Sequence, residues 1–237
     1  MKIISFVLLI TMMVLTIPAY SEDEPVGKVG VYKGEYEGPM VNGKPHGKGV
    51  IKSLNGNRFE GDFVNGQATG KGKLFYKDGD YYEGDFKNYL ADGKGKYIFS
   101  NGATYEGEYK KSSKNGFGVF TWPNGDRYEG QWKNGLKNGK GKYYWNNGNI
   151  YTGDFINEKK EGNGTFTWET GVSVKYVGEF KNDELQGEGI LYNRNGLYYK
   201  GAFIQGIPNG YGELYDKNGK LLGKGIWKNN ELVKPKK

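Results

Sequence analysis

The sequence predicts an all-β protein, an elongated single-layer antiparallel meander of β-hairpin repeats. The first observation is glycine: the chain has 41 in 237 residues, and no glycine-free stretch between Gly27 and Gly225 exceeds eight residues. Helices average about 11–12 residues and lose roughly 1 kcal/mol for each internal glycine relative to alanine, so a helical body is excluded. The second is an aromatic content of 16%, which is typical of folded strands and not of disordered segments. The third is a repeat of 23 residues.

The first 21 residues predict a secretory signal peptide. Lys2 precedes an apolar run over residues 3–17, and the small residues Ala19 and Ser21 stand at −3 and −1 of a cleavage site. We expect cleavage after Ser21, with an uncleaved N-terminal anchor as the alternative. We therefore expect an exported protein, periplasmic, at the cell surface or secreted. The chain has no cysteine, which fits a bacterial cell better than a eukaryotic one.

Residues 22–35 follow as a lead-in that contains an edge strand, and the repeats begin at residue 36. Each repeat opens on an aromatic residue, which we number position 0. The eight starts are Tyr36, Phe59, Tyr82, Tyr105, Tyr128, Tyr151, Tyr176 and Tyr199. Positions +2, +11, +13 and +20 are glycine in all eight repeats, and position +4 is a large apolar residue. Such a period indicates a repeat architecture in which stacked units stabilise one another.

Each repeat predicts one hairpin. Positions 0 to +4 and +13 to +17 alternate apolar or glycine residues with polar ones, which is the period of a strand with one apolar face. We place the turn within a repeat around +7 to +10. Between repeats, Asn-Gly or Asp-Gly at +19 and +20 predicts a type I′ turn in seven of the eight repeats.

A turn centred between +8 and +9 would set the register. Position +4 would then face +13 and position +2 would face +15, so that Phe86 covers Gly95 and Tyr97 covers Gly84. An aromatic ring over a facing glycine is a known way to stabilise glycine-rich strands. On the other face, +3 would meet +14 and pair Asp85 with Lys96.

The unit Tyr128-Glu129-Gly130-Gln131-Trp132-Lys133-Asn134-Gly135, followed by Gly139-Lys140-Gly141, resembles the MORN repeat (membrane occupation and recognition nexus). The resemblance covers residues 36–228 as eight repeats and a partial ninth, and residues 229–237 form a basic C-terminal tail. It implies a single-layer antiparallel sheet with a binding or scaffolding role. Phospholipid binding has been proposed for the family.

The composition excludes several chemistries. Without cysteine and with one histidine, the chain cannot form thiol or Cys/His zinc sites. Carboxylates recur at +1 and +3 and lysines at +12 and +14, which indicates solvated cross-strand pairs and not two carboxylates with divergent pKa values. We predict no enzymatic activity, cofactor or metal. The net charge of +7 forms no basic stripe without facing acids, so we also predict no nucleic-acid partner.

One further column is aromatic only in the middle of the array. Position +17 is Ser53, Asn193 or Asp216 in the outer repeats. In repeats two to six it is Tyr76, Phe99, Trp122, Trp145 and Trp168. These rings either pack against the aromatic at position 0 or form a contact strip for a partner, because one face of a single-layer sheet has no second layer above it.

We therefore expect a non-enzymatic exported repeat scaffold that binds a protein partner through its aromatic face or its sheet edges. Two alternatives stay open: a cell-wall or glycan-binding module, and peripheral binding to anionic phospholipid membranes. Homo-oligomers through the edge strands are a further expectation.

Overall fold

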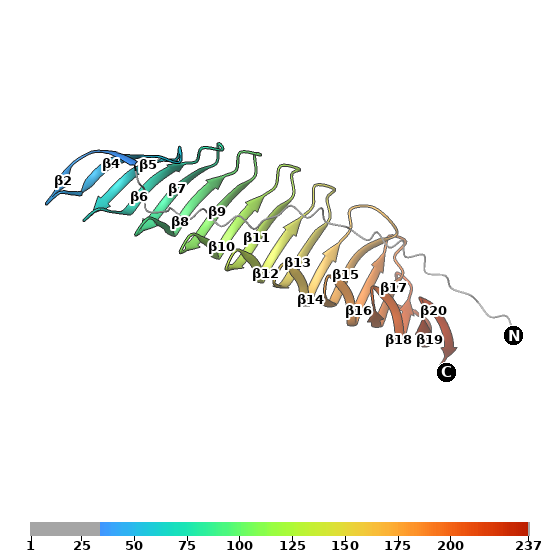
Figure 1. The fold of residues 1–237 in the computed structure, drawn as a ribbon. Helices are drawn as coiled ribbons and strands as arrows, with labels where there is room; N and C mark the ends of the chain where they lie inside the picture. Colours follow the sequence, from blue (N-terminus) through green and yellow to red (C-terminus); the bar gives the residue numbers. More distant parts are fainter. Residues whose placement is uncertain (1–33, 237) are drawn as a thin grey trace. The chain divides into compact units, whose positions relative to one another are not determined.

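The computed structural model describes residues 34–236. The predicted signal peptide lies outside these residues, as does the lead-in before Gly34. No helix occurs in the described part of the chain, and its strands are the consecutive antiparallel members of one 18-stranded sheet, apart from one small separate hairpin (Figure 1). The all-β meander is therefore confirmed.

The described residues divide into two compact units, an N-terminal unit (residues 34–137) and a C-terminal unit (residues 138–236). The strands of the N-terminal unit are β1 (Gly34–Glu37), β2 (Met40–Val41), β3 (Lys44–Pro45), β4 (Gly47–Ser53), β5 (Arg58–Val64), β6 (Gln67–Phe75), β7 (Tyr81–Lys87), β8 (Leu90–Ile98), β9 (Thr104–Lys110), β10 (Ser113–Thr121) and β11 (Arg127–Lys133). Strand β12 (Leu136–Tyr144) contains the boundary between the units. The strands of the C-terminal unit are β13 (Ile150–Ile156), β14 (Lys159–Thr167), β15 (Ser173–Lys181), β16 (Glu184–Asn193), β17 (Tyr198–Ile204), β18 (Ile207–Tyr215), β19 (Leu221–Lys228) and β20 (Glu231–Pro235).

The turn within each repeat is shorter and earlier than we predicted. It consists of positions +6 and +7 alone, as in Asn88 and Tyr89, whose φ angles are 52° and 65°. Two successive left-handed residues define a type I′ turn, so this turn type lies within the repeats and not at the Asn-Gly pairs between them. In the turn between repeats, Gly125 is left-handed with a φ of 92°. The Asn124 side chain accepts a hydrogen bond from the amide of Asp126 at 3.0 Å.

A β-bulge follows the type I′ turn and changes the register. In β7 and β8, Gly84 lies opposite Gly95, whereas Phe86 lies opposite Ala91, and the pairing shifts between them. Position +2 therefore faces +13 and not +15. Our predicted register was wrong because it placed the turn too late and allowed no extra residues. The signal for the bulge was present in the glycine at +11, which is Gly93 here with a φ of 119°.

The aromatic rings at position 0 form the core of each unit. Tyr82 is fully buried, and a Cβ atom added to Gly95 would lie 2.3 Å from its hydroxyl oxygen. Its ring therefore covers the glycine pair Gly84 and Gly95. A ring does cover glycine, as expected, but the ring is Tyr82 and not Phe86 or Tyr97. The same ring makes edge-on contacts with Phe86 and Tyr109, each with centroids 5.1 Å apart.

The tyrosine hydroxyl also satisfies a backbone group that the bulge would leave unpaired. Tyr82 donates to the carbonyl of Asp85 at 3.1 Å, and Tyr105 donates to that of Glu108 at 3.1 Å. The same bond from position 0 to +3 recurs in the C-terminal unit, as from Tyr151 to Asp154 at 3.0 Å. Buried carbonyls require such partners, so the phenol contributes more than its ring.

The partial ninth repeat ends the array with a substitution. In β19, Gly223 lies opposite Leu214, where earlier repeats place the aromatic of position 0. Leu232 of β20 fills the space, since a Cβ atom on Gly223 would lie 3.2 Å from its Cδ2 atom. Residues 231–235 of the basic tail thus form the last strand and pair with β19.

Candidate functional site

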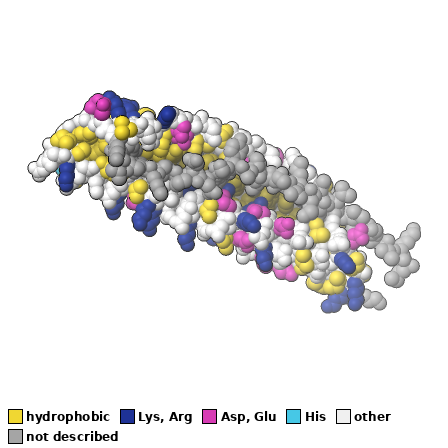
Figure 2. Space-filling model, in the orientation of Figure 1, with side chains coloured by type: hydrophobic (Ala, Val, Ile, Leu, Met, Phe, Trp, Pro, Cys, Tyr) yellow, Lys and Arg dark blue, Asp and Glu magenta, His cyan; other side chains and the backbone are white. Residues whose placement is uncertain are grey.

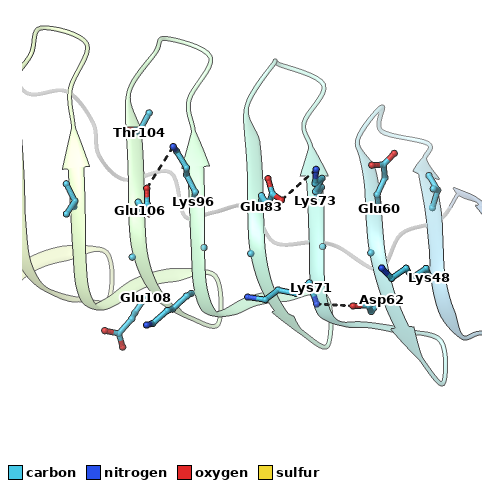
Figure 3. Close-up of a pocket in the computed structure, with 18 of the residues that line it drawn as sticks. Lys48, Glu60, Asp62, Lys71, Lys73, Glu83, Lys96, Thr104, Glu106 and Glu108 are labelled. Carbon is cyan, nitrogen blue, oxygen red and sulfur yellow. Dashed lines mark hydrogen bonds and ion pairs between the residues drawn. The ribbon is translucent and has the colours of Figure 1, made fainter.

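The N-terminal unit has an open channel on the face opposite the tyrosine rings, which we call the outer face. Its volume is about 1350 Å³. The floor is backbone, formed by the paired glycines at +2 and +13. Two rows of side chains flank this floor, one from positions +1 and +14 and the other from +3 and +12, and Figure 3 shows members of both rows.

The channel follows directly from the alternation within each strand. Residues +1 and +3 flank the glycine at +2, and +12 and +14 flank the glycine at +13, so all four side chains lie on the face that the tyrosine ring does not cover. The glycines have no side chains, so the floor stays low between the two rows.

The two rows alternate in charge from strand to strand. In the +1/+14 row, Lys73 Nζ lies 3.7 Å from Glu83 Oε1, and Lys96 Nζ lies 3.9 Å from Glu106 Oε2. In the other row, Lys71 Nζ lies 2.7 Å from Asp85 Oδ1. These pairs join one repeat to the next. They are largely exposed, so each contributes only about 0–1 kcal/mol.

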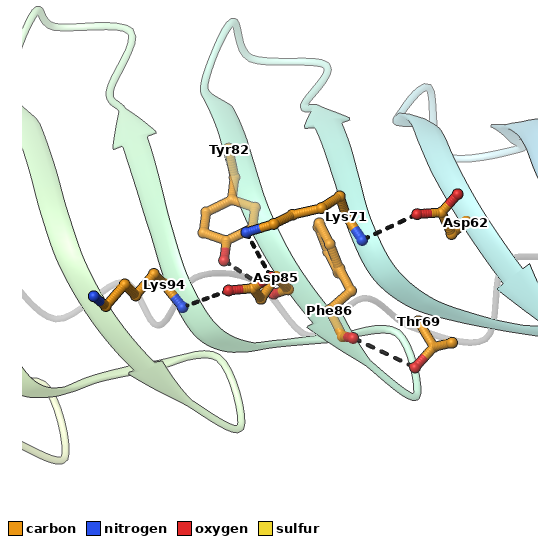
Figure 4. A network of polar contacts seen from close by, with 7 residues as sticks. All are labelled: Asp62, Thr69, Lys71, Tyr82, Asp85, Phe86 and Lys94. Atoms are coloured by element: carbon orange, nitrogen blue, oxygen red, sulfur yellow. Dashed lines mark hydrogen bonds and ion pairs between the residues drawn. The ribbon is translucent and has the colours of Figure 1, made fainter.

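Asp85, at position +3 of the third repeat, is an acid of the +3/+12 row with several polar partners (Figure 4). Its carboxylate accepts hydrogen bonds from Lys71 Nζ and from the backbone amide of Lys94, the latter at 2.9 Å. Burial alone would raise the pKa of Asp85, but these bonds and the two lysine charges outweigh burial and lower it. The bond to the Lys94 amide supports the bulge. The predicted pairing of Asp85 with Lys96 was wrong, because the bulge brings Lys96 opposite Glu83.

The predicted contact strip lies on the opposite face, among the +15 rings. Trp122 packs on Phe120 with centroids 4.5 Å apart, and Trp145 lies 4.4 Å from Tyr143 and 5.2 Å from Phe166. Both tryptophans are buried, at 8% and 9% exposure. Tyr76, Phe99 and Trp168 are half-buried. The residues that face position 0 are those at +15, as Tyr97 faces Tyr82. The +17 rings therefore pack on the +15 residues and not directly on the aromatic at position 0.

Comparison with protein families matches the repeat itself. The description of the matching family is "MORN repeat", and eight consecutive copies cover residues 36–58, 59–81, 82–104, 105–127, 128–150, 151–173, 176–198 and 199–221. The chain belongs to the MORN repeat family. The eight copies begin at the eight aromatic residues that the sequence predicted. Repeat scaffolding of a binding type is the role that MORN repeats suggest.

A comparison with curated proteins finds no match. Among solved structures, the MORN array is similar to the TCP domain of SAS-4 from Drosophila melanogaster, solved with a proline-rich motif of Ana2. That similarity has 16% identity and a TM-score of 0.38 over 80% of this chain and 97% of that one. The TCP10 domain of CPAP from Danio rerio, solved with a STIL peptide, has 15% identity and a TM-score of 0.30 over 81% and 100% of the two chains.

Sequence reasoning missed a set of buried lysines at position +9 of the middle MORN repeats. Lys114, Lys137 and Lys160 are 6%, 5% and 9% exposed. In the N-terminal unit, Lys114 Nζ lies 4.3 Å from the Trp132 ring centroid. In the C-terminal unit, Lys160 Nζ lies 5.5 Å from the Trp145 ring and 3.5 Å from Asp183 Oδ1. Contacts between a cation and ring faces stabilise such buried amines.

A sequence signal for these lysines existed in the other repeats, where position +9 is apolar, as in Ala91, Leu185 and Pro208. A column that is apolar elsewhere predicts burial for a lysine that replaces it.

No group of three or more potential metal-ligating side chains occurs within residues 34–236. The same residues contain no helix long and apolar enough to cross a membrane.

Proposed function

We propose that this protein is a non-enzymatic, exported MORN-repeat scaffold that binds a protein partner in the channel of its N-terminal unit. The observation that carries the proposal is the charge pattern of the channel. Acids and lysines alternate along both rows from β5 to β9, and the residues lining the channel include six acids and five lysines. An extended segment with side chains of both signs complements such a surface.

The same balance argues against the other ligand classes. A polyanion or an anionic bilayer would gain from clustered lysines and lose from the interleaved acids. A glycan-binding groove gains most from exposed rings, and Phe117 is the aromatic residue that lines the channel. The carboxylates also favour a binding role over catalysis, because Glu83, Asp85 and Glu106 are each engaged by a lysine.

The +17 aromatic rings of each unit, taken separately, are a second contact surface in this proposal. Tyr76, Phe99 and Trp168 keep part of their rings exposed, so a partner can reach them. Trp122 and Trp145 are buried and contribute mainly by holding the strip in place. Exposed aromatic residues are frequent anchors of protein interfaces.

The test uses the mature protein against four immobilised probes: an array of mixed-charge peptides, anionic vesicles, neutral vesicles and cell-wall polysaccharide. Each is measured at low and high salt. We expect selective capture of peptides that carry both signs, weakened by salt because the pairs are exposed. Capture by anionic vesicles alone would assign membrane binding instead, and capture by polysaccharide alone would assign glycan binding.

Variants locate the surface. Lys71→Glu with Lys94→Glu reverses one row of the channel and should abolish peptide capture. Lys87→Glu with Lys110→Glu is the matched control, because both residues are exposed on the same unit but do not line the channel. Equal loss in the two variants would reject the channel as the site.

Export is tested separately. Expression of the whole chain in a bacterial host, followed by fractionation and N-terminal sequencing, should give a protein outside the cytoplasm that begins at Glu22. A cytoplasmic protein that begins at Met1 would contradict export.

A further inference from the structure

The outer face changes composition along the array. Position +1 is glutamate in the first five repeats and then becomes Thr152, Val177 and Lys200. Position +3 is an acid in Asp62 and Asp85 but becomes Ala202 in the eighth repeat. In the partial ninth repeat, β19 places Lys224 and Ile226 in the same two columns. The acids that neutralise lysines in the earlier repeats are therefore replaced at the C-terminal end.

Two exposed apolar side chains, Tyr211 and Ile226, form an apolar centre on β18 and β19. Tyr211 of β18 lies opposite Ile226 of β19, which in turn lies opposite Lys234 of β20. Lys236 places its Nζ atom 5.8 Å from the Tyr211 ring centroid. Tyr211 and Ile226 are 44% and 42% exposed, so a partner can reach both side chains.

Unneutralised positive charge surrounds this centre. Residues 199–237 contain eight lysines and three acids, which accounts for most of the net charge of +7. Within the described part of the chain, no ion pair involves Lys200, Lys224, Lys234 or Lys236. Glu213 lies opposite both Lys200 and Lys224, but its carboxylate accepts a hydrogen bond from the Tyr215 hydroxyl at 2.5 Å. Figure 2 shows basic and hydrophobic side chains next to one another at this end of the C-terminal unit.

We propose that Tyr211, Ile226 and the surrounding lysines Lys200, Lys224, Lys234 and Lys236 form a second docking surface, which binds an acidic segment of a partner protein that also carries apolar side chains. Carboxylates of the segment pair with the lysines, and its apolar side chains cover Tyr211 and Ile226. A second copy of this chain is a poor occupant, because its own C-terminal end is basic. Lysine and Pro235 on the last strand also oppose edge-to-edge pairing.

The limited exposure of the apolar centre favours a peptide over a bilayer. Insertion into a membrane needs side chains that project beyond their surroundings, whereas Tyr211 and Ile226 are more than half covered. A peptide needs only a surface against which its own apolar groups pack. This surface is independent of the channel proposed above, because it lies in the other unit and is basic, whereas the channel carries both signs of charge.

The experiment measures fluorescence anisotropy of a labelled peptide of alternating glutamate and valine, titrated with the mature protein. A lysine–valine peptide and vesicles with and without phosphatidylserine serve as the other arms. We expect the acidic peptide to bind at least tenfold more tightly than the basic one, with affinity that falls as salt rises. Lys234→Glu with Lys236→Glu should weaken binding by about tenfold or more, and Tyr211→Ser should weaken it without changing the salt dependence.

Lys87→Glu with Lys110→Glu is the matched control, since it reverses two exposed lysines of the N-terminal unit that belong to neither proposed surface and should leave binding of the acidic probe intact. Circular dichroism confirms that each variant is folded. The proposal is overturned if both peptides bind equally, if the Lys234 and Lys236 changes have no effect, or if only phosphatidylserine vesicles bind. Failure of the unaltered protein to capture mixed-charge peptides, with binding of the acidic peptide retained, would reject the channel alone.

Discussion

The outer faces of β5–β9 and of β17–β20 have the same backbone design but different side chains. In β5–β9, lysines at +12 and +14 meet acids of the next repeat, as in the 2.7 Å pair of Lys71 and Asp85. In β17–β20, the columns that supply those acids hold Lys200, Ala202, Lys224 and Ile226. Position 0 is a fully buried tyrosine in both regions, Tyr82 in the first and Tyr199 in the second. The buried face therefore determines the fold, and the outer face is free to determine the ligand.

The largest expected effect is a loss of folding stability on removal of a tyrosine ring at position 0. Tyr105→Ala removes a fully buried ring, its edge-on contacts with Tyr109 and Trp132 and its hydrogen bond to the Glu108 carbonyl. We expect a loss of about 3–5 kcal/mol in the free energy of unfolding, measured by urea denaturation. Tyr105→Phe keeps the ring and should lose only about 1 kcal/mol. Equal losses for the two variants would show that the ring is not the stabilising element.

The aromatic strip should divide into two classes. Trp122→Ala should cost about 3 kcal/mol because the ring is buried. Trp168→Ala should cost about half as much, because that ring is only half-buried. Urea denaturation of the two variants, with partner capture measured per folded molecule, compares them directly. If Trp122→Ala lowers capture per folded molecule more than Trp168→Ala does, Trp122 contacts the partner and its role is not limited to packing.

A smaller effect concerns the contribution of Asp85, which pairs with Lys71, to stability and to its dependence on pH. The pKa of Asp85 is lowered in the folded protein, so its stabilising contribution is complete above its unfolded pKa of about 4 and is lost as pH falls through the lower folded value. Asp85→Asn should cost about 1 kcal/mol at pH 7 and remove this part of the acid sensitivity. Urea midpoints at pH 7 and pH 3 measure both. Lys71→Gln is the control, since it removes the ion pair but keeps the carboxylate and its bond to the Lys94 amide. An Asp85→Asn protein with unchanged acid sensitivity would contradict this assignment.

Much of this comparison could be predicted from the sequence. The period, the eight starts and the alternation of glycine with aromatic residues predicted the sheet and its two faces. The register was missed, although glycine at +11 signals the bulge, because we gave more weight to Asn-Gly at +19 and +20. The type I′ turn lies instead at +6 and +7, where Tyr89 and Ser112 replace glycine in two repeats. That shift moved Asp85 from Lys96 to Lys71. The burial of Lys114 was also missed, since lysine ordinarily indicates solvent and only the apolar residues in the same column of other repeats suggest otherwise.

The central claim, that the aromatic face sets stability and the outer face sets the ligand, is tested most directly by thermal unfolding of one variant. In that variant Lys200, Lys224, Lys234 and Lys236 are all replaced by glutamine, and binding of the acidic peptide is measured on the same sample. Because these lysines make no ion pair within residues 34–236, we predict a midpoint within about 2–4 °C of the parent, equivalent to at most about 1 kcal/mol. Binding of the acidic peptide should fall at least tenfold. A large drop in the midpoint, or unchanged binding at an unchanged midpoint, would contradict the separation of the two faces.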